Sequence, residues 1–280
     1  MTNMAFLILT AAVVIQSGHT PETGRSSRER QVASLERQAE AGDLKAQVQL
    51  GLAYASGYGM PVDEAEAVKW FRKAAEKGDP PGEYLLSEMY FTGRGVEVDM
   101  GEALKWLTRS AEHGDPHAQS NLGALYLRGQ VVPKDEVEAA RWIRKAADQG
   151  LSAGQFELGS LYAHGMGVSQ SETEAAAWYR KAADQGDTPA MNNLAYLQAT
   201  SGNPKVRNTK EAVLVAQRAA EIEPNNATYL DTLATAFFEA GQPDKATEAE
   251  QRAMMLSPEN PSYKKALQKY QAANQHTQHR

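Results

Sequence analysis

Cysteine is absent from the 280-residue chain. Its absence excludes disulfide bonds, a catalytic thiol, cysteine-ligated metal sites and lipid attachment to an N-terminal cysteine. Any stability or chemistry must therefore come from packing and from the other polar side chains.

The chain also lacks a basic excess. It carries 29 Lys and Arg against 35 Asp and Glu, a formal net charge of -6, and its pI is about 5.6. A nucleic-acid-binding surface needs clustered positive charge to meet the phosphates. The charge balance argues against such a partner, and we expect no nucleic acid.

Long hydrophobic runs are scarce. Residues 4–15 form the most conspicuous one, and their 12 residues fall short of the roughly 20 that a membrane-spanning helix takes. The run fits the apolar part of a secretory signal, although no Lys or Arg precedes it. We expect residues 1–18 to be a signal peptide or N-terminal anchor and residues 19–30 a flexible linker. The protein is then exported, periplasmic or secreted, without stable membrane insertion unless the segment stays uncleaved; a cytoplasmic location is the alternative.

Catalytic motifs are missing as well. Neither Gly-x-Ser-x-Gly nor His-Glu-x-x-His occurs. His113 and His117 are four residues apart, but Gly114 and Pro116 between them indicate a turn, not one helix face. Pairs such as Gly57 and Gly59 lack the third glycine of a dinucleotide-binding loop. We predict no enzyme activity, no metal and no cofactor.

Tryptophan is scarce too, but its placement is informative. The four tryptophans recur every 36 residues, at Trp70, Trp106, Trp142 and Trp178. Spacing of this length indicates an internal repeat and a solenoid of stacked supersecondary units. We predict an all-α, right-handed α-solenoid of helix-turn-helix repeats.

Other positions keep the same step. A leucine, a tyrosine, a turn glycine and a closing glycine recur in every unit: Leu50, Leu86, Leu122 and Leu158; Tyr54, Tyr90, Tyr126 and Tyr162; Gly57, Gly93, Gly129 and Gly165; Gly78, Gly114, Gly150 and Gly186. Residues spaced by four, such as Leu50 and Tyr54, share one helix face. Each unit is therefore a short helix, a glycine-rich turn, a longer helix and a tight turn.

Two positions of the unit indicate how repeats pack. A small residue follows each leucine, at Gly51, Ser87, Gly123 and Gly159. Glycine inside a helix costs about 1 kcal/mol relative to alanine, so its recurrence indicates close approach by a neighbouring helix. Each tryptophan is expected to be a large core anchor between units.

The pattern resembles the Sel1-like repeat, a relative of the tetratricopeptide repeat with longer loops. The matching residues of the fourth unit are Leu158-Gly159, Tyr162, Gly165-Met-Gly167-Val168, Glu174-Ala175, Trp178, Lys181-Ala182-Ala183 and Gly186. The resemblance covers residues 44–187 as four units. It implies protein-binding adaptor work. The missing cysteines argue against close kinship with the disulfide-linked members of that group.

The flanking segments follow a looser pattern. Residues 188–258 are similar to two tetratricopeptide-like repeats, and residues 259–280 are expected to form a capping helix and a polar tail. Residues 31–43 are a degenerate N-terminal capping helix, with Ser34 where a tryptophan would stand. Asn226-Ala-Thr228 matches a glycosylation acceptor, but its place at the start of the last repeat favours a helix cap.

The resemblance also implies which side chains line a concave groove, because the first helix of each repeat faces inward in such folds. The inward register predicts a partner-binding groove that is aromatic in places and not basic. Its residues are Val48, Leu52, Tyr84, Glu88, Phe91, Arg128, Phe156, His164, Asn192, Tyr196, Asp231 and Phe238.

Three functions fit this reading. The favoured one is a non-enzymatic scaffold or adaptor of the bacterial cell envelope that binds a partner protein or peptide in the groove. The second is an enzyme acting on cell-wall or β-lactam compounds, or a modulator of cell-wall enzymes, for which the sequence supplies no activated nucleophile. The third is a eukaryotic endoplasmic-reticulum adaptor, in which Asn226 would carry a glycan.

Overall fold

The computed structural model describes residues 21–278, and the segment 1–18 expected to be a signal or anchor lies outside them. Fourteen helices and no strand occur in this part of the chain. They are α1 (Pro21–Glu40), α2 (Leu44–Ser56), α3 (Glu64–Ala75), α4 (Pro80–Thr92), α5 (Met100–Glu112), α6 (Pro116–Arg128), α7 (Glu136–Asp148), α8 (Ser152–His164), α9 (Glu172–Asp184), α10 (Thr188–Thr200), α11 (Thr209–Ile222), α12 (Ala227–Glu239), α13 (Pro243–Leu256) and α14 (Pro261–Gln278).

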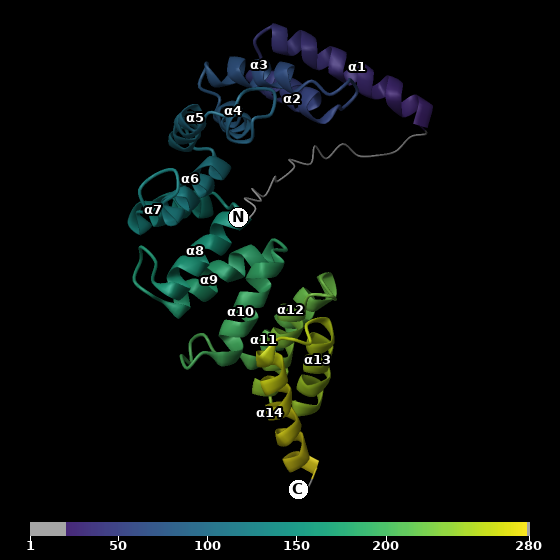
Figure 1. Ribbon diagram of the computed structural model, residues 1–280, viewed down its shortest axis with the longest axis vertical. Helices are drawn as coiled ribbons and strands as arrows, with labels where there is room; N and C mark the ends of the chain where they lie inside the picture. The colour runs from purple at the N-terminus through teal and green to yellow at the C-terminus, as the bar shows by residue number, and fades with distance from the viewer. Residues whose placement is uncertain (1–20, 279–280) are drawn as a thin grey trace.

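The helices form an arc (Figure 1). Each packs mainly against the helices before and after it in the chain. In the first three repeats α2, α4 and α6 lie on the inner side of the arc, and α3, α5 and α7 lie on the outer side (Figure 1). The predicted all-α solenoid of helix-turn-helix repeats is the observed fold.

The two ends of the solenoid are more helical than the sequence analysis expected. The predicted linker 19–30 is wrong from Pro21 onward, because α1 begins there and runs on through the predicted capping helix. Contacts with the first repeat explain this extension: the Arg28 guanidinium lies 5.3 Å from the Tyr58 ring centroid, and the Tyr58 hydroxyl donates to Gln31 Oε1 at 2.8 Å. At the other end α14 continues to Gln278, through most of the segment expected to be a polar tail.

Helix ends are set by the same residues in successive repeats. An aspartate caps the first helix of most units, as Asp79 Oδ2 does by accepting from the backbone amide of Gly82 at 2.9 Å. A glycine at positive φ ends these helices, such as Gly57 at φ 73°. The fourth unit departs from the pattern, because Leu151 stands at the cap position and makes no side-chain hydrogen bond.

The tryptophans fasten each repeat to the one before it. Trp106, on α5, packs in a cluster with Val68 and Phe71 of α3. Trp142 and Trp178 reach back in the same way, and these three side chains are only 6–7% exposed. The expected anchors between units are confirmed for these three tryptophans, while Trp70 is only partly buried.

The recurring small residue makes room for a side chain from the partner helix of its own repeat. A Cβ added at Gly159 would lie 2.6 Å from Tyr179 Cδ1, and one added at Gly123 would lie 2.5 Å from Ile143 Cγ1. Those distances are below any ordinary carbon–carbon contact. Close approach by the neighbouring helix is therefore the reason for the small residue.

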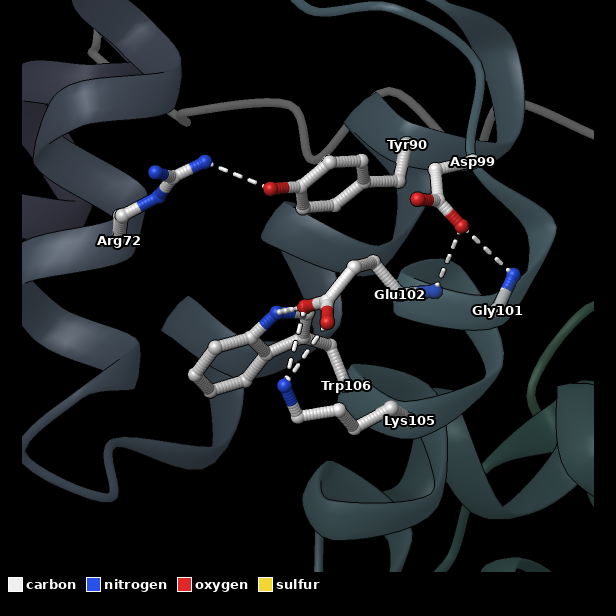
Figure 2. A network of polar contacts seen from close by, with 7 residues as sticks. All are labelled: Arg72, Tyr90, Asp99, Gly101, Glu102, Lys105 and Trp106. Atoms are coloured by element: carbon white, nitrogen blue, oxygen red, sulfur yellow. Dashed lines mark hydrogen bonds and ion pairs between the residues drawn. The ribbon is translucent and has the colours of Figure 1, made fainter.

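Signature residues of the second helix also carry polar roles (Figure 2). Asp99 Oδ1 caps α5 by accepting from the amides of Gly101 and Glu102 at 2.9 and 3.0 Å. The Glu102 carboxylate then accepts from the Trp106 indole at 2.9 Å and from the Lys105 ammonium at 2.9 Å (Figure 2). Glu102 thus orients Trp106 on the same helix.

A second contact in the same view joins two repeats. Arg72, on α3, donates through Nη2 to the hydroxyl of Tyr90 on α4 at 2.6 Å (Figure 2). Arg144 makes the equivalent bond to Tyr162 two repeats later. The recurring tyrosine is therefore a polar link between neighbouring repeats as well as a packing residue.

A pair of side chains staples the two helices of a repeat together. In the third and fourth units the pair is made of amides: Gln149 Nε2 donates to Gln119 Oε1, and Gln185 Nε2 to Gln155 Oε1, both at 2.8 Å. In the second unit the same positions hold His113 and Glu83. Glu83 is fully buried, and its carboxylate lies 2.7 Å from His113 Nδ1 and 3.0 Å from Arg109 Nη2.

We expect His113→Ala to lower the free energy of unfolding by about 1–2 kcal/mol, because the buried Glu83 carboxylate loses its hydrogen bond and keeps only its ion pair with Arg109. The double variant Glu83→Gln/His113→Gln rebuilds the amide pair of the next two repeats. It should stay within about 1 kcal/mol of the wild type, because a neutral amide pair needs no counter-charge. Urea denaturation followed by circular dichroism measures both. A double variant that loses more stability than His113→Ala alone would contradict this assignment.

Candidate functional site

The inward positions of the first helices differ widely in exposure. Three of the predicted partner-binding residues are exposed: Arg128, His164 and Tyr196. Six are half-buried: Leu52, Tyr84, Glu88, Phe156, Asp231 and Phe238. The remaining three are buried.

Those three need correction as partner-contacting side chains. Val48, Phe91 and Asn192 are 9, 7 and 9% exposed. Phe91 belongs to the core cluster that contains Leu107 and Trp142. Val48 and Asn192 stand at inward positions of their helices, and Phe91 stands beside one. The packing of neighbouring helices nevertheless covers all three side chains.

A polar and aromatic cluster links α4 to α6. The rings of Tyr84 and His117 stack with their centroids 5.9 Å apart and their planes at 27°. Asn121 Nδ2 donates to the Tyr84 hydroxyl at 3.2 Å. Burial is the largest cause that raises the pKa of Tyr84 above its ordinary value, so its phenol is a neutral hydrogen-bonding group.

The cluster continues from α6 to α8. The Ser120 hydroxyl donates to Glu157 Oε2 at 2.7 Å. Burial raises the pKa of Glu157 to about 7, although the Ser120 hydroxyl and the positive charge of Arg128 act in the opposite direction. Glu157 therefore changes its charge near neutral pH, beside an exposed arginine.

Glu88 stands one turn beyond Tyr84 on α4. Its Oε1 atom is buried and accepts no hydrogen bond from any described residue. Burial raises the pKa of this carboxyl as well. The Glu88 side chain is therefore a half-buried polar group whose Oε1 atom lacks a donor.

Further along, the predicted aromatics separate into two kinds. Phe156 packs against the ring of Tyr179, with centroids 5.9 Å apart, so part of its surface belongs to the core. Tyr196, at an inward position of α10, is 52% exposed. His164, exposed at the end of α8, donates from Nδ1 to the Ser160 carbonyl at 2.8 Å.

The last two of the predicted partner-binding residues, Asp231 and Phe238, lie on α12. Phe238, on α12, packs against Tyr270 of α14, with ring centroids 4.8 Å apart. The Lys269 ammonium of α14 lies 4.2 Å from the centroid of the Phe238 ring. Asp231 is half-buried on the same helix. The inward sides of α2, α4, α6, α8 and α10 therefore remain open. We call these sides together the inner face.

Among residues 21–278, no group of three or more His, Asp or Glu could hold a metal ion. None of the helices described is both long and apolar enough to cross a membrane. His113 and His117 point to different partners, Glu83 and Tyr84 respectively.

Sequence reasoning did not single out His117, Asn121 and Glu157. One signal could have found the last two. Their repeat position is occupied in turn by Gln49, Leu85, Asn121, Glu157 and Asn193, while the leucine that follows it stays constant. A position that varies inside a strict repeat is one that the fold does not dictate.

Comparison with known proteins identifies the repeat. The family model described as Sel1 repeat matches residues 44–79, 80–115, 116–151, 152–187 and 188–221. The chain belongs to the Sel1 repeat family. The fifth match covers residues 188–221, which the sequence pattern assigned to the tetratricopeptide-like part, so the Sel1 repeats extend beyond residue 187.

Solved structures agree with the assignment. The chain is similar to a protective antigen present in uropathogenic Escherichia coli strains, with 32% identity and a TM-score of 0.70 over 84% of this chain. It spans 50% of the length of that antigen. It is also similar to a Sel1 repeat protein from Oxalobacter formigenes, with 32% identity, a TM-score of 0.64, and coverage of 72% of this chain and 88% of the other.

A more distant likeness concerns the fold alone. A tetratricopeptide repeat protein with an unusual peptide-binding site shares 19% identity at a TM-score of 0.51, over 70% of this chain and 96% of the other. A search of curated proteins gave no match. Sel1 and tetratricopeptide repeats in general mediate protein–protein interactions, and the inner face is where this Sel1 chain offers varied side chains.

Proposed function

We propose that this Sel1 repeat protein is a non-enzymatic scaffold of the bacterial cell envelope that binds a partner protein or peptide on the inner face. The observation that carries the proposal is Tyr196, whose large aromatic side chain is 52% exposed at an inward position of α10. Exposed tyrosines are frequent anchors of protein interfaces, because one rigid ring buries much surface at little entropic cost.

The polar groups of the inner face supply specificity. Arg128 offers an exposed cation beside Glu157. An occupant that brings an acceptor to the Arg128 guanidinium gains a charge-assisted hydrogen bond. A rigid series of repeats holds these groups in place before binding, which lowers the entropic cost of association.

The envelope location rests on a separate set of observations. The apolar run at residues 4–15 fits a secretory signal. The two similar solved structures come from bacteria, and one of them is an antigen. Fractionation of cells that express the full chain tests this part of the proposal, and recovery in the cytoplasm alone would remove it.

Photo-crosslinking in cells tests the binding face. A photoreactive residue is placed at Tyr196 or at Arg128, and, as matched controls, at Leu214 or Met255, which are 66 and 79% exposed on second helices. We expect the two inner-face positions to capture a common partner and the two controls to capture none. Capture from Leu214 or Met255 alone would place the interface on the other side of the solenoid.

We expect Tyr196→Ala to weaken binding of that captured partner by at least about tenfold, the scale of an aromatic interface anchor. Leu214→Ala should change the affinity by less than about twofold, because an exposed side chain away from the interface contributes little. Titration with the purified partner measures both. Equal affinities for the wild type and Tyr196→Ala would show that the tyrosine is not an anchor.

A further inference from the structure

A buried carboxyl without a counter-charge lies in the last repeat. Glu250, on α13, is fully buried, and neither of its oxygen atoms accepts a hydrogen bond from a donor among the described residues. Buried charges are normally paired or hydrogen-bonded, because the interior solvates them poorly. Glu250 therefore needs a different explanation.

The neighbour of Glu250 is a second acid. Asp231 of α12 lies within hydrogen-bonding reach of it, so the two carboxyls interact across the α12–α13 contact. Two carboxylates cannot donate to each other. They form a hydrogen bond only when one of them carries a proton, and like charges at such a distance oppose the loss of that proton.

The pair sits under the helix that closes the solenoid. On α14, Tyr270 is 4% exposed, and its hydroxyl lies 3.2 Å from Thr235 Oγ1 of α12. The charges of Glu250, Asp231 and Glu239 all act on this phenol. The one basic group of α14 described beside these rings is Lys269, whose ammonium lies over the faces of Phe238 and Tyr270.

Burial, and then the charge of Asp231, raise the pKa of Glu250 to about 8, and burial also raises the pKa of Asp231. In the unfolded chain a glutamate titrates near its ordinary value of about 4.3. Between these two values the folded repeat holds a proton that the unfolded chain has released. Stability therefore falls as pH rises through this window and levels off above it.

We propose that Asp231 and Glu250 form a proton-sharing pair that keeps α12, α13 and α14 closed at mildly acidic to neutral pH and loosens this end of the solenoid when the shared proton is lost. Opening uncovers Asp231, Phe238 and Tyr270, and so lengthens the inner face by one repeat.

Hydrogen exchange of the full chain at pH 5.5, 6.5, 7.5 and 8.5 tests the proposal. Opening constants are obtained after correction for the intrinsic rate at each pH, with peptides of α2 and α3 as an internal reference. For α12 to α14 we expect the opening constant to rise by up to about tenfold per pH unit between 5.5 and 7.5, the limit for one proton released on opening. It should rise less above 8.

Two variants separate the pair from a general effect of pH. Glu250→Gln keeps the shape of the side chain and can donate to Asp231, so the opening constants of α12 to α14 should become nearly independent of pH. Asp231→Asn removes only the like charge and should reduce the dependence without abolishing it. Circular dichroism checks that the variants fold. If only one of them folds, that variant is sufficient for the comparison with the wild type.

The proposal is overturned by either of two results. One is a wild type whose corrected opening constants for α12 to α14 are the same at pH 5.5 and 7.5. The other is a folded Glu250→Gln or Asp231→Asn variant that keeps the full pH dependence of the wild type. Both readouts are independent of partner binding. This proposal can therefore fail without contradicting the proposed function, and the proposed function can fail without contradicting this proposal.

Discussion

We expect Trp142→Ala to lower the free energy of unfolding by about 3–5 kcal/mol, the usual cost of removing a buried aromatic side chain. Trp142 is 6% exposed and packs with Phe91 and Leu107 of the preceding repeat and with Leu122 of its own repeat. Alanine cannot reach these residues, so a cavity opens at the contact between the second and third repeats. Urea denaturation followed by circular dichroism measures the loss.

Trp70→Ala is the matched control. Trp70 occupies the same repeat position but is only partly buried, against the cluster of α1 and α2, and the Lys73 ammonium lies 3.7 Å from the ring centroid. Because less apolar surface is lost, we expect a cost of about 1–2 kcal/mol. Equal losses for the two variants would contradict the view that burial against the preceding repeat sets the value of each tryptophan.

The second large effect is expected at Gly167. Its backbone has a φ of 66°, and a Cβ built there would lie 1.8 Å from the backbone oxygen of Glu136. Gly167→Ala therefore adds an overpacking cost of about 1–3 kcal/mol to the left-handed strain of about 1–2 kcal/mol. Because the obstacle is backbone, the loop after α8 must move away from the start of α7.

Gly150→Ala isolates the strain. Gly150 also has a positive φ, 89°, but nothing lies within 4 Å of a Cβ built on it. This variant should lose only the strain component of about 1–2 kcal/mol. Thermal and urea unfolding of the pair give the difference, and a Gly167 variant as stable as the Gly150 variant would show that the close approach is not maintained in solution.

The repeat itself could be predicted in detail because its causes are local and recur. A 36-residue step in tryptophan, leucine, tyrosine and glycine fixes helix faces and turns, and four copies confirm one another. The small residue at Gly123 or Gly159 was interpreted correctly for the same reason. Each instance repeats one packing requirement.

The extent of the helices at the two ends and the burial of the inward side chains were predicted less well from the sequence. The extent of α1 depends on long-range contacts, such as that between Gln31 and Tyr58, which no local pattern reports. Val48 stands at an inward position and Phe91 beside one, but their burial is decided by neighbouring helices. Covering of Phe238 depends on α14 folding back over it, a tertiary event outside the repeat.

The backward reach of the tryptophans has a consequence for synthesis on the ribosome. The cluster around Phe71 and Leu86 is completed by Trp106, which emerges well after Phe71. At about 5–20 residues per second, one 36-residue unit takes about 2–7 s to synthesise. During elongation the newest repeat therefore always has an unsealed core, and each core closes one repeat behind the growing end.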